Sequence, residues 1–242
     1  MRAVAVICAR MGSTRLPGKA LADIEGRPLL SVLLARVRRS AVDGIIFATT
    51  EEKADDVLID WARSEGCLRF RGSTDDVLNR VVGAARQMQA DIVVRVCGDT
   101  PLIDPAMIDV GVTLVREGVC DLAMGNNQRR FPFGVSAHVC KYADLAWLDR
   151  SLYDRVQREN VTLAMWETPG KYRVHAYAGR RAWELPGQRL QVDYPEDLEV
   201  ICAIHKALGP GDHYGTGEIV RFLRAHPEIA ALNHDRKEKP VR

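Results

Sequence analysis

A dense group of basic, hydroxyl and glycine residues follows the first apolar run of the chain. The segment RMGSTRLPGK begins at residue 10 and contains Arg10, Arg15 and Lys19 together with two hydroxyl side chains and two glycines. Guanidinium and ammonium groups neutralise phosphate oxygens, and glycines let backbone amides approach those oxygens closely. This combination predicts a loop that binds the phosphates of a nucleoside triphosphate.

Two common nucleotide-binding motifs do not fit this segment. A P-loop has four residues between its glycines and a serine or threonine after its lysine, whereas five residues separate Gly12 from Gly18 and Ala20 follows Lys19. The GxGxxG fingerprint is also absent from the first predicted strand-to-helix turn, which argues against NAD and flavin dinucleotides. The alternative is that this segment is an ordinary solvated turn that binds no ligand.

Two aspartates follow predicted strands that are far apart in the sequence. VVRVCGDTPLIDP places Asp99 directly after an apolar run, and LQVDYPEDLEVI places Asp193 at the end of a short predicted strand. Ligands of doubly wound sheets lie at the carboxyl ends of the strands, and Mg²⁺ prefers hard oxygen ligands. The pair therefore predicts a magnesium site. The alternative for each residue is a turn or a helix cap.

The segment RGSTDDVLNRV supplies a weaker candidate. Ser73, Thr74 and Asp75 precede a helical pattern and are expected to cap that helix. A contact of Arg71 with a nucleobase is a hypothesis only. Asp104 precedes Pro105 and is expected to cap the next helix.

Composition and motif spacing exclude several other functions. The 242 residues are 47% hydrophobic, enough for one sizeable core, and the net charge of +2 provides no field toward nucleic acid or an anionic membrane. The six histidines and six cysteines show no zinc-ligand spacing, and no GxSxG motif is present. The amino-terminal apolar run is too short to span a membrane and lacks a signal-cleavage pattern, so a cytoplasmic location is expected.

Apolar runs alternate with helical patterns along the first half of the chain. Strands are expected at 3–9, 44–49, 68–71 and 92–97, and helices at 29–40, 54–64 and 75–88. This alternation indicates a single α/β domain over 1–242 with a doubly wound, mostly parallel sheet. Further helices are expected at 144–150, 154–167, 195–208 and 217–225, and strands at 172–178 and 189–192. The less regular stretch of about 120–180 is predicted to recognise an acceptor and to contact a second subunit.

Five segments taken together resemble the cytidylyltransferases of the spore-coat polysaccharide biosynthesis type. They are ARMGSTRLPGKAL, RGSTDDVLNRV, VVRVCGDTPLIDP, RENVT and LQVDYPEDLEVI, which span about residues 3 to 205 in the same order. The segments are more distantly similar to the synthetases that make CMP-linked ketodeoxyoctonate and CMP-sialic acid. The resemblance implies a three-layer α/β/α fold of the glycosyltransferase A type, usually dimeric, with CTP as substrate and Mg²⁺ as cofactor.

The resemblance also implies roles for particular residues. It assigns Asp99 and Asp193 to Mg²⁺, and it implies that Arg10, Lys19 and Asp99 take part in catalysis. The residues expected to contact the nucleotide are Ala9, Arg10, Gly12, Ser13, Arg15, Lys19, Arg71 and Asp99.

The half of the chain that is expected to bind the acceptor departs from the family pattern. Phe133, His138 and Arg158 are the expected acceptor-binding residues. Relatives commonly carry an acidic residue where Phe133 stands, Glu where His138 stands and His where Asn160 stands. These differences remove negative charge and a titratable group, so they put the acceptor in doubt and leave the reaction type intact. A small anionic acceptor is expected: a sugar acid, a phosphosugar or a phosphonate.

The expected reaction is in-line attack of an acceptor oxygen on the α-phosphorus of CTP, with pyrophosphate leaving. An anionic acceptor needs no strong base, whereas a sugar hydroxyl would require one, for which His138 or His175 is available. Two alternatives stay open. One is a glycosyltransferase that uses a preformed sugar nucleotide, and the other is a module that binds a nucleotide without reacting.

Overall fold

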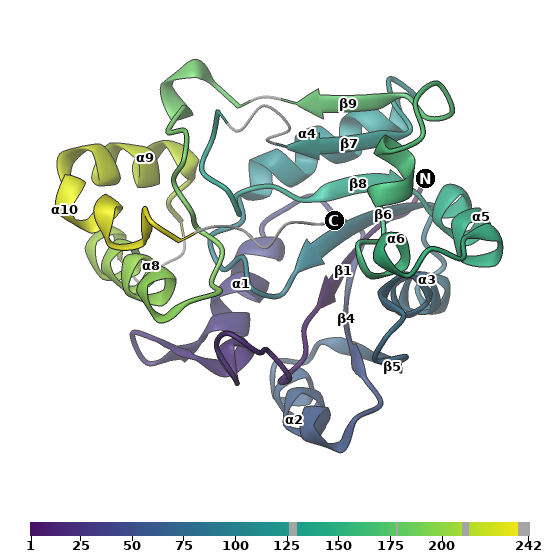
Figure 1. Ribbon diagram of the computed structural model, residues 1–242, viewed down its shortest axis with the longest axis horizontal. Helices are drawn as coiled ribbons and strands as arrows, with labels where there is room; N and C mark the ends of the chain where they lie inside the picture. The colour runs from purple at the N-terminus through teal and green to yellow at the C-terminus, as the bar shows by residue number, and fades with distance from the viewer. Residues whose placement is uncertain (126–129, 178, 210–212, 237–242) are drawn as a thin grey trace.

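The computed structural model describes residues 1–125, 130–177, 179–209 and 213–236, which fold around a seven-stranded sheet (Figure 1). The strands are β1 Ala3–Cys8, β4 Gly44–Thr50, β5 Leu68–Gly72, β6 Ile92–Cys97, β7 Leu122–Gly125, β8 His138–Lys141 and β9 Val174–Tyr177. They lie in the order β5-β4-β1-β6-β8-β7-β9, and β8 alone runs antiparallel to its neighbours. The predicted doubly wound, mostly parallel sheet is confirmed. A small hairpin, β2 Asp23–Ile24 and β3 Arg27–Pro28, stands apart from it.

Helices connect and cover the strands. They are α1 Leu29–Val37, α2 Asp56–Ser64, α3 Val77–Gln87, α4 Pro105–Arg116, α5 Tyr142–Ser151, α6 Arg155–Glu159, α7 Leu163–Trp166, α8 Pro195–Leu208, α9 Thr216–Ala225 and α10 Pro227–Ala230. Single 3₁₀ turns occur at Lys19–Leu21, Lys53–Asp55, Arg181–Trp183 and Ala231–Asn233. Helix α8 begins and ends at the residues predicted from the sequence.

Successive side chains of β1 pack on opposite faces of the sheet, as the period of a strand requires. Ala5 and Ile7 join α1, α2 and α4 in one buried cluster, whereas Val4 and Val6 join α3 and α5 in another. Both faces are therefore covered, which explains why β1 is a continuous apolar run. The result is the expected three-layer α/β/α arrangement.

A third apolar cluster lies beyond the carboxyl ends of the central strands. Val200 and Ile204 of α8 pack there against Leu190 and Val192, together with residues of α9. This packing holds the segment before α8 beside the sheet, where it can meet the end of β6.

The predicted helix over 154–167 is wrong in its middle. The chain instead forms α6 and α7, separated at Val161, whose φ is +54°. Val161 is fully buried, and the hydroxyl of Thr162 lies 2.7 Å from Nδ1 of His138. These tertiary contacts outweigh the local helical preference.

The predicted strand over 189–192 is also wrong. Only an isolated parallel bridge joins Arg189 to Phe133. Gly134 has φ +104°, and a Cβ atom there would lie 2.8 Å from the carbonyl carbon of Leu190. Only glycine tolerates this backbone and this approach, so the 133–134 turn and the 189–193 segment are held together as irregular chain.

Helix caps show one correct prediction and one error. Asp104 caps α4, because its carboxylate accepts a hydrogen bond of 2.9 Å from the amide of Ala106. The cap of α3 is Asp76, which accepts from the amide of Asn79 at 3.0 Å, and not the predicted residues 73–75. The predicted strand over 172–178 forms at β9, and its last residue, Ala178, lies outside the described residues.

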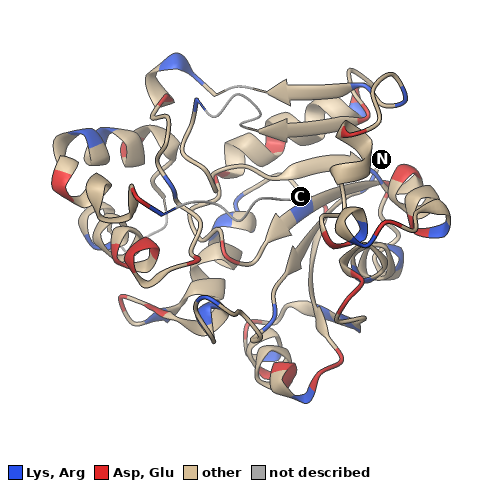
Figure 2. Cartoon of the chain, viewed as in Figure 1, with Lys and Arg blue, Asp and Glu red and all other residues tan. Residues whose placement is uncertain are grey.

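Figure 2 shows charges of both signs mixed over the outer helices, whereas the strands are mostly uncharged. This distribution agrees with the small net charge of +2. In the described part of the chain, no helix is both long enough and apolar enough to cross a membrane.

Candidate active site

The carboxyl ends of β1 and β6 approach each other more closely than ordinary residues would allow. The amide of Gly98 donates a 2.8 Å hydrogen bond to the carbonyl of Cys8. A Cβ atom at Gly98 would lie 2.5 Å from that of Ala9, so a side chain there would push the two strands apart. Gly98 thereby brings the start of the basic loop next to Asp99.

Asp55, from the turn before α2, anchors the basic loop. Its carboxylate accepts hydrogen bonds from the amide of Met11 at 2.7 Å and from the hydroxyls of Thr49, at 3.0 Å, and Thr50. Burial raises the pKa of this carboxyl, but the Met11 amide and the threonines outweigh it and hold the pKa below its usual range. Sequence reasoning missed Asp55, because a loop acidic residue carries no distinctive local pattern.

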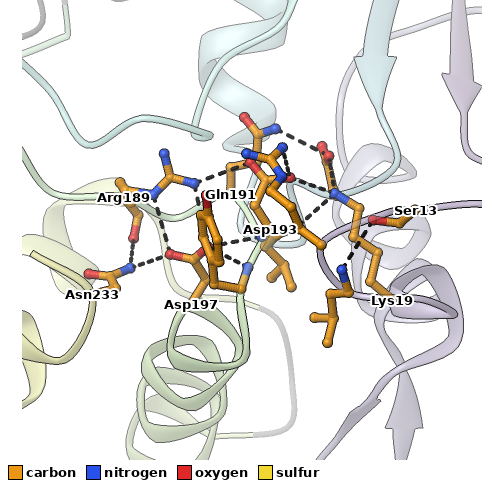
Figure 3. Close-up of polar contacts among 12 residues, drawn as sticks. Ser13, Lys19, Arg189, Gln191, Asp193, Asp197 and Asn233 are labelled. Atoms are coloured by element: carbon orange, nitrogen blue, oxygen red, sulfur yellow. Dashed lines mark hydrogen bonds and ion pairs between the residues drawn. The ribbon is translucent and has the colours of Figure 1, made fainter. Parts of the chain in front are cut away.

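Lys19 joins the two predicted metal-binding aspartates. Its Nζ lies 2.7 Å from Oδ2 of Asp99, 2.8 Å from Oδ1 of Asp193 and 2.8 Å from the carbonyl oxygen of Val192 (Figure 3). Burial lowers the pKa of Lys19, but the two carboxylates raise it by more, so the amine stays protonated. Three segments that are distant in the sequence therefore meet at one ammonium group.

Asp193 is surrounded by cations. Besides Lys19, it pairs with Arg15 at 2.7 Å through Oδ1 and with Arg189 at 3.2 Å through Oδ2. Burial raises its pKa, whereas the hydrogen bond and charge of Lys19 and then the two arginines lower it to a value below the usual range. The carboxylate is therefore ionised at neutral pH.

Asp99 retains one oxygen without a partner. Oδ2 accepts from Lys19 and, at 3.1 Å, from Nε2 of Gln191, whereas Oδ1 is buried and accepts nothing from the described residues. A carboxylate oxygen without a hydrogen-bond partner, next to a second carboxylate, is suited to bind Mg²⁺, whose ligands are commonly one or two protein carboxylates together with phosphate and water oxygens. No group of three or more His, Cys, Asp or Glu residues that could hold a metal occurs in the described chain. The remaining ligands would therefore have to come from a nucleotide and water.

A buried network behind Asp193 keeps its segment in place. Asp197 accepts from the amides of Asp193 and Tyr194, both at 2.9 Å, and its carboxylate pairs with Nε of Arg189 at 3.3 Å. Asn233 donates to the same carboxylate at 2.8 Å (Figure 3). The sequence interpretation explained Asp197 only by the helix dipole. Its position three residues after the helix cap was the available signal for a capping box.

Three of the other predicted nucleotide-binding residues belong to the basic loop itself. Arg10 is exposed, and its guanidinium donates a 3.5 Å hydrogen bond to the carbonyl of Thr74. Space is open beside Gly12, and Ser13 stays within the loop, where its Oγ accepts from the amide of Leu16 at 3.5 Å.

Arg71 does not join the group around Lys19. Its guanidinium donates to the carbonyls of Thr50 at 2.9 Å and Glu52 at 2.8 Å, and it pairs with Asp56 at 2.5 Å. These bonds fasten β5 to the end of β4 and the start of α2.

The predicted acceptor-binding residues are dispersed. Phe133 pairs through its backbone, donating to Gln188 and accepting from Leu190. Arg158 is held by the carboxylates of Asp76 at 2.6 Å and Asp149 at 2.7 Å, so it ties α6 to α3 and α5.

His138 lies on β8 in a partly buried position. Burial, followed by the charge of Arg95, lowers the pKa of His138 to about 3. The imidazole is therefore neutral at physiological pH, and it contacts the hydroxyl of Thr162.

Known proteins match both the sequence and the structure. A family model described as Cytidylyltransferase matches residues 4–206. The chain is 33% identical over 232 residues to the spore coat polysaccharide biosynthesis protein SpsF of Bacillus subtilis (strain 168), a match that covers 93% of this chain and 95% of that protein.

Two solved structures share the fold. The structure of a cytidylyltransferase from Leptospira borgpetersenii serovar Hardjo-bovis (strain JB197) matches with a TM-score of 0.90 and 28% identity, covering 99% of this chain and 100% of that one. A CMP:2-keto-3-deoxy-manno-octonic acid synthetase complexed with CTP matches with a TM-score of 0.66 and 21% identity, covering 86% of this chain and 100% of that one. Because the matching family model spans the loop that carries Lys19 and both aspartates, the chain belongs to the cytidylyltransferase family.

Proposed function

We propose that the protein transfers CMP from CTP to a small anionic acceptor, releases pyrophosphate and uses Mg²⁺. The observation that carries this proposal is the meeting of Lys19 with Asp99 and Asp193 at the carboxyl edge of the sheet. Ligands of doubly wound folds bind at that edge. A structural neighbour, the CMP:2-keto-3-deoxy-manno-octonic acid synthetase, is complexed with CTP, which supports CTP as the nucleotide.

Each residue of the site has a role in this reaction. Asp99 and Asp193 would hold Mg²⁺, which when bound polarises the α-phosphoryl group. Lys19 and Arg15 would neutralise the oxygens of the departing pyrophosphate. An acceptor oxygen forms a bond to the α-phosphorus as the bond from that phosphorus to the bridging oxygen breaks, and the electron pair leaves with pyrophosphate.

The structure supports a change of partner by Lys19 during this cycle. Its ammonium is shared by two carboxylates at the end of a flexible stem, so triphosphate oxygens would compete with Asp99 and Asp193 for it. In the absence of nucleotide, the same contact offsets the repulsion between the two carboxylates. An anionic acceptor, such as a sugar acid, a phosphosugar or a phosphonate, would need no general base.

The test is a turnover assay with CTP, Mg²⁺ and a panel of these three acceptor classes. Pyrophosphate is measured by a coupled assay and the CMP conjugate by mass spectrometry, with UTP, ATP and GTP as comparisons. Lys19→Ala is expected to lower turnover by about 10²- to 10³-fold. Arg63→Ala, which breaks an exposed ion pair with Asp60 on α2, is the control and is expected to retain full turnover.

Two results would replace the proposal with another function. Consumption of a preformed sugar nucleotide without pyrophosphate release would indicate a glycosyltransferase. Binding of CTP without turnover across the whole panel would indicate a nucleotide-binding module.

Three further statements stay predictions. The segment 120–180 is proposed to recognise the acceptor and to form a homodimer, which light scattering coupled to gel filtration measures directly. The chain is proposed to act as one domain over 1–242 and to reside in the cytoplasm. The sequence resemblance is the basis for proposing that five residues of the described chain contact CTP: Ala9, Arg10, Gly12, Ser13 and Arg71. For the last four, the test is the affinity of the alanine variant for CTP.

A further inference from the structure

Arg95 is a basic residue in an otherwise apolar strand. It lies on β6, and its Nε is buried without a hydrogen-bond partner. Among the described residues, its guanidinium also forms no ion pair. The side chain as a whole is only partly buried, and a buried N–H donor that has lost its water without gaining a partner is destabilising. The position is therefore suited to an anion that comes from outside the chain.

The neighbours of Arg95 in the ladder formed by β1, β6 and β8 are an aliphatic side chain, an imidazole and two thiols, and none of them is a carboxylate. In the ladder between β6 and β8, Arg95 stands directly opposite His138, which is held neutral. Toward the carboxyl edge, Cys8 and Cys97 form the next pair on the same face of the sheet. Burial raises the pKa of Cys8, so this thiol also stays uncharged at neutral pH.

A second arginine reaches the same place from α3. Arg80 is only 3% exposed, its Nη1 donates to the carbonyl of Ser73 at 2.7 Å, and its Nε is buried without a partner. Although burial dominates the pKa of Cys8, Arg80 and Arg95 both lower it, and Arg80 does so partly by a hydrogen bond. Both guanidinium groups therefore lie near this thiol, and each retains an unused Nε–H donor.

This pair of arginines is separate from the centre around Lys19. β6 ends at Cys97 and Asp99 lies in the turn that follows, so the four residues from Arg95 to Asp99 span at most about 13 Å. The charge of Asp99 nevertheless acts on the guanidinium of Arg95. Only a molecule with a group remote from the one that reacts beside Asp99 would therefore reach Arg95.

We propose that Arg95, assisted by Arg80, binds a second anionic group of the acceptor, a phosphoryl or carboxylate group remote from the oxygen that attacks CTP. The inference rests on the proposed function and narrows its acceptor class. The acceptor then carries two functional ends: a nucleophilic oxygen beside Asp99 and an anionic group up to about 13 Å away. A guanidinium forms bidentate, charge-assisted hydrogen bonds with either kind of oxyanion. A neutral sugar without such a group would bind poorly.

The ladder register supplies a decisive variant. His138→Glu places a carboxylate directly across from Arg95, at a separation where opposite charges of neighbouring strands pair. That carboxylate would occupy Arg95 from within the chain. His138→Gln is the matched control, because it is neutral and of nearly the same size as glutamate.

The direct test uses inorganic phosphate and acetate as probes of protein labelled with ¹⁵N-arginine. The Nε–H resonance of Arg95 is assigned by its loss in Arg95→Lys, and each anion is titrated. We expect a saturable shift of this resonance in the wild type, the same shift in His138→Gln, and a shift reduced at least 10-fold in His138→Glu. Saturation at lower phosphate than acetate indicates a phosphoryl group, and the reverse order indicates a carboxylate.

Two outcomes would overturn the inference. One is an Arg95 resonance that moves with neither anion in the folded wild type, and the other is an equal response in His138→Glu and His138→Gln. Lys19→Ala separates this result from the proposed function, since it should keep the response of Arg95 while losing affinity for CTP. Once an acceptor is known, Arg95→Met should raise its KM by about 10- to 100-fold and leave the KM for CTP unchanged.

Discussion

Replacing Lys19 by alanine removes the cation that Asp99 and Asp193 share. The ammonium makes hydrogen bonds of 2.7 and 2.8 Å to the two carboxylates, with 14% of the lysine side chain exposed. Removing one member of a buried ion pair costs about 3–5 kcal/mol. In the variant, Asp193 still pairs with two arginines, and Asp99 still accepts a hydrogen bond from the side-chain amide of Gln191. The loss of stability is therefore smaller than the full cost of breaking a buried ion pair. We expect Lys19→Ala to lower the free energy of unfolding by about 2–4 kcal/mol.

Urea unfolding followed by circular dichroism measures this change. For a chain of this length, the expected loss corresponds to a fall in Tm of roughly 4–16 °C. The variant should also respond more strongly than the wild type to added Mg²⁺, because no ammonium competes with the metal for the carboxylates. Arg63→Ala, whose ion pair is exposed, should change the free energy of unfolding by less than about 1 kcal/mol and should not alter the response to Mg²⁺.

One combination of results would refute this reasoning. If Lys19→Ala unfolds within about 0.5 kcal/mol of the wild type and Mg²⁺ shifts both Tm values equally, then the lysine does not hold the two carboxylates together in solution. The contacts in the structure would then carry no measurable energy. The assignment of the two aspartates to one metal would lose its main support.

Three further perturbations test the parts that support the site. Folding lowers the pKa of His138 from 6.5 to about 3, so between these pH values the imidazole is protonated in the unfolded chain but not in the folded one. The free energy of unfolding should therefore fall as the pH drops below 6.5, by up to about 1.4 kcal/mol per pH unit. His138→Gln should remove this slope in urea titrations between pH 7 and 5. Asp55→Ala leaves the amide of Met11 and the hydroxyls of Thr49 and Thr50 without their acceptor, and it should cost about 3 kcal/mol in urea unfolding while raising the KM for CTP about 10-fold. Gly134→Ala forces an alanine to φ +104° against Leu190 and should cost about 3 kcal/mol or more, measured as a fall in Tm.

Each of these predictions has a result that contradicts it. An unchanged pH slope in His138→Gln would mean that this imidazole is not held neutral by the fold. Wild-type affinity for CTP in Asp55→Ala would show that the basic loop keeps its shape without the anchor. A Gly134→Ala variant as stable as the wild type would mean that the 133–134 turn has another accessible backbone conformation.

Elements with a strong local pattern were predicted well. The apolar runs of β1, β4 and β6 form central strands, and α8 occupies the residues predicted for it. These patterns are visible in the sequence because a buried parallel strand needs apolar side chains on both faces, and proline favours the start of a helix. The cap at Asp104 follows from the same local chemistry.

Elements set by distant contacts were predicted poorly. The break at Val161 depends on its burial and on the contact between Thr162 and His138, which a helical period cannot reveal. Gln191 was overlooked as a partner of Asp99, because an amide near a strand has no distinctive spacing. Arg95 looked like an ordinary member of an apolar run, because the sequence does not reveal that its Nε is buried without a hydrogen-bond partner.

The sequence by itself determined the chemical groups available to this protein and the ends of strands at which they stand: a basic loop after the first strand and carboxylates at Asp99 and Asp193. Only the tertiary structure decided that these groups meet at Lys19, and that Arg71 and Arg158 are instead fastened to other parts of the fold. The reason is physical. Residue type and spacing govern local backbone preferences, whereas the partner of a charged side chain depends on which distant segments the packed core brings within about 3 Å of it.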